Sequence, residues 1–320
     1  MANISLDLDN QWSYMKTHGD DAWESYPSYY KIFVPHILEI LEELNIKITF
    51  FIVGLDADNK ENAKYLKAIA DKGHEFGNHS YQHEVWIDNY SREQLIEELD
   101  KAEKAIKSAT GKSTVGFRGP GFSWSKELFH VLKEKGFNFD GSLLPMFLGP
   151  LARYYYFRKS NFTKEEKEIR KRLFGSVWDG FRPSKPFNWK LNDNDKLLEI
   201  PVSTIPLVKV PFHMSYLLYL SNISMLLMKI YLWFALCMCR LFSVNFSFLL
   251  HPLDIIGGDK IDELSFFPGM DISTEKKLKV FKYVIKKINR NFDLYPMGAF
   301  TQKYLSKFGK RIRNKKIPVN

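Results

Sequence analysis

Residues 47–83 read KITFFIVGLDADNKENAKYLKAIADKGHEFGNHSYQH, and the order of elements that they predict decides the fold. Residues 47–53 are largely apolar and predict a buried strand, whereas residues 61–72 have the spacing of a helix. Residues 74–78 predict a second strand. A strand, a helix and a strand of these lengths predict two parallel strands joined by a helical crossover.

The same alternation extends in both directions from this stretch. Residues 4–9 alternate apolar and polar side chains and predict a first strand, and residues 33–44 place apolar side chains on one face at helical spacing. Further predicted elements are a helix at 91–108 that begins with a capping box, strands at 114–117, 137–139, 197–202 and 246–250, and helices at 125–135 and 273–289. These units predict an α/β fold whose parallel strands are joined by helices.

We predict one barrel domain over residues 1–305, with insertions at 145–195 and 206–244 and a basic tail at 306–320. The first insertion contains the run RYYYFR at 153–158, and it could form a lid, a substrate wall or a solvated excursion. The second is strongly apolar at 216–242, which is typical of a helix packed on the barrel, a membrane-spanning helix or a helix resting on the inner leaflet. The tail could be a solvated terminus or contact an anionic membrane.

The formal net charge of +9 favours anionic partners, but its sign does not choose among phosphorylated lipids, sugars and nucleic acids. Cys237 and Cys239 lie one residue apart in the apolar stretch, which argues against a disulfide or a zinc knuckle and indicates a reducing compartment. The amino terminus lacks the basic and long apolar regions of a secretory signal, so we expect a cytoplasmic protein.

Two aspartates stand at the end of the first predicted strand. Asp7 and Asp9 are two residues apart, so their side chains point to the same side, near the carboxyl end where barrel enzymes place their sites. The pattern D-x-D alone also occurs in nucleotide-sugar glycosyltransferases.

A pair of histidines completes a candidate metal site. His79 and His83 are four residues apart and converge on one ion if the segment is helical or tightly turned. Together with Asp9 they leave coordination positions for water and substrate. Zinc fits these ligands best, and cobalt, nickel and manganese are alternatives.

Three further segments place polar groups at predicted strand ends. Arg118 lies before glycines at 119 and 121, where it could pair with a buried carboxylate while an amide near Gly121 donates to an oxyanion. His251 ends a late apolar strand and could act as a general acid. Either Asp254 or Asp140 could hold its tautomer and raise its pKa.

Together these motifs resemble the polysaccharide deacetylase superfamily, the NodB-homology group also called carbohydrate esterase family four. The matching segments are DLD at 7–9, GHEFGNHSYQH at 73–83, FRGPG at 117–121, FDGS at 139–142 and LHPLD at 250–254. With EIPVS at 199–203, the set resembles the branch found in bacterial exopolysaccharide and O-antigen biosynthesis. The resemblance implies a distorted (β/α) barrel and hydrolysis of N-acetyl groups from amino sugars.

The resemblance also implies roles for individual residues. Asp9, His79 and His83 would bind the metal, Asp7 would be the general base paired with Arg118, and His251 would be the general acid, while Gly121 and Phe122 would serve the substrate or oxyanion. The sequence departs from the family pattern because Leu8 separates the two aspartates and Gly121 stands where an aromatic residue is common.

The predicted function is metal-dependent removal of an N-acyl group, most simply acetyl, from an amino sugar in bacterial surface polysaccharide or glycolipid biosynthesis. The alternatives are a deformylase of a lipid-linked amino sugar and an amidohydrolase of a small ureide. Outside the hydrolases, a D-x-D glycosyltransferase and an inactive sugar-binding module remain open. The expected partners are an acylated amino sugar, which a lipid diphosphate could carry, and the inner face of the cytoplasmic membrane, with no nucleic acid.

Overall fold

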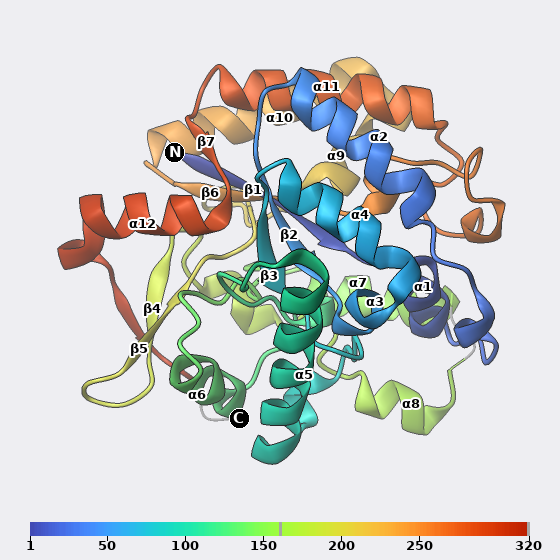
Figure 1. Ribbon diagram of the computed structural model, residues 1–320. Coiled ribbons are helices and arrows are strands. Elements are labelled where there is room, and N and C mark those ends of the chain that lie inside the picture. Colours follow the sequence, from blue (N-terminus) through green and yellow to red (C-terminus); the bar gives the residue numbers. More distant parts are fainter. Residues whose placement is uncertain (160–161, 319–320) are drawn as a thin grey trace.

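A parallel sheet forms the centre of the protein. The computed structural model describes residues 1–159 and 162–318. In spatial order the sheet holds β3 (Glu75–Asn78), β2 (Thr49–Ile52), β1 (Ala2–Leu8) and β6 (Phe246–Leu250), with the short β7 (Leu294–Tyr295) beside the start of β1. Leu8 pairs with Ile52 and Ile52 pairs with Asn78, so the carboxyl ends of three strands meet at one edge (Figure 1).

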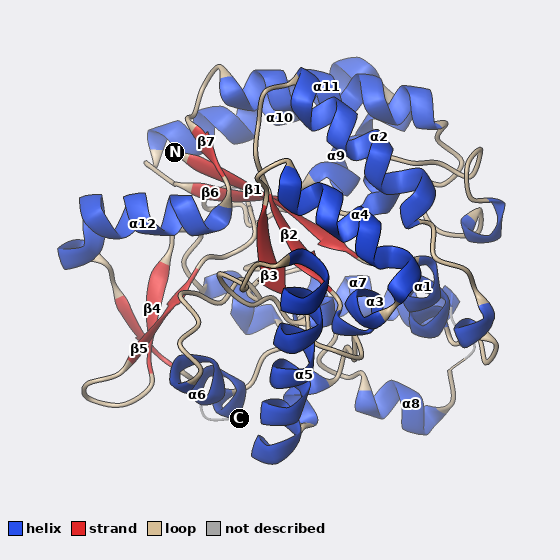
Figure 2. Cartoon of the chain, in the orientation of Figure 1, coloured by secondary structure: helices blue, strands red, loops and turns tan. Residues whose placement is uncertain are grey.

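Single parallel bridges carry this sheet round into a closed ring. They join Asn78 to Phe117, Phe117 to Asp140, Asp140 to Glu199, and Val202 to Ser247 in β6. The path therefore returns to β1 through β6, and helices surround it (Figure 2). The predicted distorted barrel is confirmed.

The strands predicted at 114–117 and 137–139 are reduced to the bridge residues Phe117 and Asp140. The Arg118 amide still donates to the Asn78 carbonyl, but the chain then enters the Gly-Pro-Gly turn and leaves the ladder. Similarly, the strand predicted to continue to residue 202 ends at Glu199, because Pro201 has no amide to donate.

Most predicted helices are present. The helices before residue 145 are α1 (Gln11–His18), α2 (Tyr30–Glu43), α3 (Gly54–Asp58), α4 (Lys60–Asp71), α5 (Arg92–Thr110) and α6 (Lys126–Glu134). The helices after residue 145 are α7 (Gly149–Lys159), α8 (Lys164–Ile169), α9 (Met214–Ile223), α10 (Met225–Leu241), α11 (Thr274–Asn289) and α12 (Met297–Phe308). The predicted capping box at Ser91 is confirmed. The helix α1 lies where we predicted neither a helix nor a strand, and the Asn10 side chain caps it by accepting from the Gln11 amide.

The apolar stretch at 216–242 is two helices and not one. The chain becomes extended at Ser224, which ends α9 and whose hydroxyl caps α10 by accepting from the Leu227 amide. Within residues 1–159 and 162–318, no helix combines the length and apolar character needed to cross a membrane.

A small second sheet lies beside the barrel. In it β4 (Phe187–Lys190) pairs with β5 (Lys196–Glu199) in an antiparallel hairpin, and β8 (Asn314–Lys316) pairs with β4 in parallel. Part of the segment predicted as a basic tail is thus a strand of this sheet and not a free terminus.

Gly77 tests the packing inside the ring. A Cβ at this position would lie 2.3 Å from the ring of Phe51, which itself is fully buried. We expect Gly77→Ala to lower the free energy of unfolding by roughly 1–3 kcal/mol in chemical denaturation, because the core must shift. Gly309→Ala is the control, since nothing lies within 4 Å of its Cβ and its φ is helical. Equal stability of both variants would contradict this packing.

Candidate metal and catalytic site

The three predicted metal ligands meet at the carboxyl edge of the sheet. Asp9 follows β1, and His79 follows β3. The Asp9 Oδ1 atom lies 3.1 Å from His83 Nε2 and 3.5 Å from His79 Nε2, and all three side chains are buried. Candidate ligand atoms from the three residues all lie within 4.8 Å of one another.

This arrangement fits a shared cation. Asp9 Oδ1 is shielded from solvent, yet it makes no well-formed hydrogen bond within the part of the chain that the structure describes. A buried carboxylate oxygen without such a partner is costly unless a charge or donor satisfies it. One carboxylate and two imidazoles are ligands that zinc and neighbouring transition metals accept.

The turn from residue 79 to residue 83 holds the two imidazoles in place. His79 Nδ1 lies 2.6 Å from the Arg118 carbonyl oxygen, so it donates there and leaves Nε2 free to face Asp9. Ser80 and His83 have φ angles of 62° and 56°, which are unusual for residues with side chains. The Glu98 carboxylate accepts from the amides of Tyr81 and Gln82 and ties the turn to α5.

The charge states of Asp9 and His79 favour metal binding. Burial alone would raise the pKa of Asp9, but the neighbouring His83 and His79 lower it to about 2. Burial lowers the pKa of His79, which favours the neutral imidazole. A deprotonated carboxylate and a neutral imidazole are the forms that bind a metal.

Asp7 forms a buried ion pair beside the metal ligands. Its Oδ1 atom lies 2.6 Å from Arg118 Nη1, and both side chains are buried. Arg118 also donates to the Ser5 hydroxyl and to the Gly141 carbonyl, and its guanidinium lies over the ring of Phe51. The predicted pairing of Asp7 with Arg118 is present in the structure.

His251 approaches Asp7 from the end of β6. Its Nε2 atom lies 3.9 Å from Asp7 Oδ2, and its Nδ1 atom lies 3.7 Å from Asp254 Oδ2. Burial alone would lower the pKa of His251, but the carboxylates of Asp254 and then Asp7 raise it to about 9. The imidazole is therefore protonated at neutral pH, as a general acid requires.

Of the two carboxylates predicted to assist His251, Asp254 is the one that reaches it. The Asp254 carboxylate also accepts from the His251 backbone amide at 2.8 Å. Asp140 instead accepts from the hydroxyl and amide of Ser142, at 2.7 Å and 3.1 Å. Burial raises the pKa values of Asp140 and of its neighbour Glu199. The Ser142 hydroxyl in turn accepts from the Gly119 amide at 2.8 Å, so Asp140 supports the turn that follows Arg118.

Gly121 and Phe122 lie in a tight turn after Arg118. Their φ angles are 60° and 62°, and a Cβ on Gly121 would lie 2.6 Å from Leu173. The Phe122 amide donates to the Gly119 carbonyl, so it is already used inside the turn. Phe122 packs against Leu144 and its apolar neighbours.

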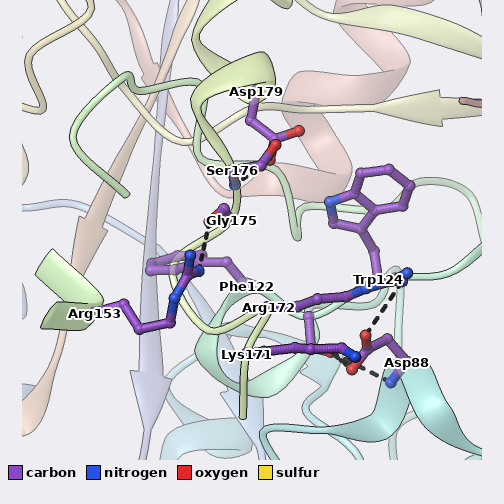
Figure 3. A pocket seen from close by; sticks show the side chains of 10 residues that line it. Asp88, Phe122, Trp124, Arg153, Lys171, Arg172, Gly175, Ser176 and Asp179 are labelled. Carbon is purple, nitrogen blue, oxygen red and sulfur yellow. Dashed lines mark hydrogen bonds and ion pairs between the residues drawn. The ribbon is translucent and has the colours of Figure 1, made fainter. Parts of the chain in front are cut away.

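The first insertion forms one wall of a pocket next to this turn. Arg153, Lys171 and Arg172 line it together with Phe122 and Trp124 (Figure 3). Arg153 donates to the carbonyls of Leu173 and Gly175, and Arg172 lies 3.5 Å from Asp88.

His213 lies next to His251, although none of the sequence motifs includes it. It is buried before α9, its ring lies 6.4 Å from that of His251, and its Nδ1 atom has no hydrogen-bond partner among the described residues. Burial and the nearby His251 lower its pKa to about 4. The sequence signal was weak, because one histidine at the edge of an apolar stretch has no recognisable spacing to the other motifs.

The chain is similar in sequence to known deacetylases. The family model described as polysaccharide deacetylase matches residues 19–139. A peptidoglycan deacetylase from Helicobacter pylori is 29% identical over 176 residues, which cover 53% of this chain and 57% of the relative. A peptidoglycan deacetylase-like protein from Gibberella zeae is 29% identical over 217 residues, which cover 62% of this chain and 60% of the relative. The chain thus spans less than two thirds of the length of both relatives.

One solved structure extends the likeness to nearly the whole fold. A Mycobacterium smegmatis protein assigned to the polysaccharide deacetylases superposes with a TM-score of 0.59 at 17% identity, covering 99% of this chain and 94% of the other. At this identity the likeness concerns the fold alone.

The metal site is tested by the metal content of the purified protein. We expect His79→Ala to bind at least tenfold less zinc after loading with zinc and dialysis, because the variant loses one of the three protein ligands. His130→Ala is the control, because His130 lies on α6, away from the cluster. Retention of a full equivalent of zinc by His79→Ala, measured by mass spectrometry of the metal, would contradict the assignment.

Proposed function

Because the chain belongs to the polysaccharide deacetylase superfamily, we propose that it removes the N-acetyl group of an amino sugar in a bacterial surface polysaccharide or glycolipid. The observation that carries the proposal is the meeting of three groups at one barrel rim. The possible metal ligands around Asp9, the Asp7–Arg118 pair and the protonated His251 lie within contact distances of one another.

Asp9, His79 and His83 would hold a divalent ion, with zinc as the first choice and cobalt, nickel or manganese as alternatives. Such an ion polarises an acyl carbonyl and lowers the pKa of a water molecule next to it. Asp9 and the imidazoles serve only to hold it.

The reaction adds water to the acyl carbon and breaks the bond between that carbon and the sugar nitrogen. Asp7 accepts a proton from the attacking water, and Arg118 keeps its carboxylate fixed at 2.6 Å. His251 gives a proton to the departing nitrogen, so that acetate and a free amino sugar leave. The turn at Gly121 would face the oxygen on which negative charge develops.

The buried ion pair weighs against the glycosyltransferase alternative. Asp7 is engaged by Arg118, whereas a D-x-D site uses its carboxylates for a metal and a nucleotide diphosphate. That alternative also leaves His251 without a role. A deformylase or ureide hydrolase would use the same groups and differs only in the acyl group or the amine.

In this proposal a lipid diphosphate carries the sugar, and the reaction takes place at the inner face of the cytoplasmic membrane. The support is the net charge of +9 and the apolar α9–α10 segment.

Acetate release from a panel of substrates tests the function. The panel holds acetylated and formylated amino sugars in free, nucleotide-linked and lipid-linked form, and we expect release of acetate together with a free amine. His251→Ala should lower kcat by roughly 10²–10⁴, because an acid of this kind contributes that much. Asp7→Asn should act similarly, but it also leaves Arg118 unpaired in the core, so its thermal unfolding is measured alongside. Unchanged turnover in His251→Ala would overturn its role.

The pH profile tests the partnership of His251 with Asp254. Activity should fall as the pH rises through about 9, because the proton that His251 donates is lost there. Asp254→Asn removes the carboxylate that raises this pKa, so the alkaline midpoint of kcat/KM should move to lower pH. Asp193→Asn, on an exposed surface pair, should leave the midpoint in place. An alkaline midpoint that Asp254→Asn does not move would refute the assignment.

A further inference from the structure

The outer side of α9 and α10 exposes a continuous set of apolar side chains. Tyr219, Ile223, Leu226, Ile230, Trp233 and Leu241 are each more than half exposed. We call these residues the apolar face. The opposite side of α10, which includes Met228, Leu232 and Cys239, is buried in the core. The helix pair is therefore apolar on the side that packs and also on the side that faces outward, which marks an interaction surface.

Cations lie along one edge of this face. Residues 200–253 contain no aspartate or glutamate. Lys229 lies over the ring of Tyr283 in α11, and Lys287 of α11 lies over the same ring. Arg240 donates to Asn291. Lys287 of the neighbouring helix α11 thus lies with Lys229 along one edge of the apolar face.

The α9 end of the face carries both signs of charge. Lys276 of α11 and the carboxylate of Asp271 are both hydrogen-bonded to Asn222 there. The remainder of the edge, along α10, is basic.

An anionic lipid surface matches this combination better than a second copy of the chain. Aromatic side chains such as Trp233 and Tyr219 favour the boundary between lipid and water, and lysines beside them attract anionic headgroups. A two-fold dimer through the same face would bring equal cations, such as Lys229 and Arg240, towards their own copies. With 10 and 17 residues, α9 and α10 suit lying in the surface of a bilayer.

We propose that the apolar face docks the protein on anionic membranes, so that the metal ligands and catalytic residues at the carboxyl edge of the sheet lie beside the lipid surface. Helix α9 connects the apolar face to the catalytic site. His213 lies directly before the first turn of α9, and its ring is 6.4 Å from that of His251. Tyr219 is six residues further on, about 9 Å along the helix axis. This inference deepens the proposed function, on which it rests, by naming the surface of the protein that contacts the membrane carrying the substrate.

Vesicle binding by the full chain tests the docking. Cys237 is exposed on α10 whereas Cys239 is buried, so a polarity-sensitive dye on Cys237 reports contact of this helix with lipid. We expect the dye emission to shift to the blue with vesicles of phosphatidylcholine and phosphatidylglycerol, and much less with phosphatidylcholine alone. Ile230→Glu with Trp233→Glu should weaken co-sedimentation by roughly tenfold or more.

The control is Leu305→Glu, which changes an exposed leucine on α12 and should bind vesicles like the parent. All variants should release acetate from a soluble substrate at the parent rate, which shows that they are folded. Absence of vesicle binding with normal acetate release would overturn the docking and leave the proposed function standing. Vesicle binding without acetate release from any substrate would overturn the function instead. A dimer in light scattering that the double variant abolishes would assign the face to a second copy.

Discussion

The buried guanidinium of Arg118 is the group on which the site depends. It carries a full charge into a position without solvent contact, and the Asp7 carboxylate at 2.6 Å forms an ion pair with it. The same residue donates to Ser5 and Gly141, which belong to separate segments of the ring. Its carbonyl oxygen also orients His79. One residue therefore fixes the proposed base and one proposed metal ligand.

Electrostatic balance then separates the roles of groups that lie close together. Asp9 faces two imidazoles and is held deprotonated, with a pKa of about 2, whereas His251 faces two carboxylates and has a pKa of about 9. His213 has a ring 6.4 Å from that of His251, but burial and that neighbour lower its pKa to about 4. An acid, a ligand set and a neutral histidine can thus share one rim because each has different neighbours.

The sequence predicted the elements whose pattern is local, and the barrel that they form. Periodicity located β1, β2 and α5, and the capping box at Ser91 fixed where α5 begins. The sequence predicted strands where the structure has only single bridges, at Phe117 and Asp140. The length of these strands depends on backbone hydrogen bonds to residues far away in the chain, which the local pattern does not reveal. The break at Ser224 was missed since serine rarely stops an apolar helix by itself. Asp254 reaches His251 through a local contact across three residues, whereas the position of His213 beside His251 depended on a tertiary contact that no spacing in the chain records.

The account predicts that three residues from two strand ends bind one ion, and anomalous X-ray scattering at the zinc edge measures this directly. The expected result is a single peak at about 2.0–2.2 Å from Nε2 of His79, Nε2 of His83 and an Asp9 oxygen, with Asp7 still paired to Arg118. A zinc-soaked crystal that shows no peak among these atoms, or a peak bound by other residues, would contradict the account.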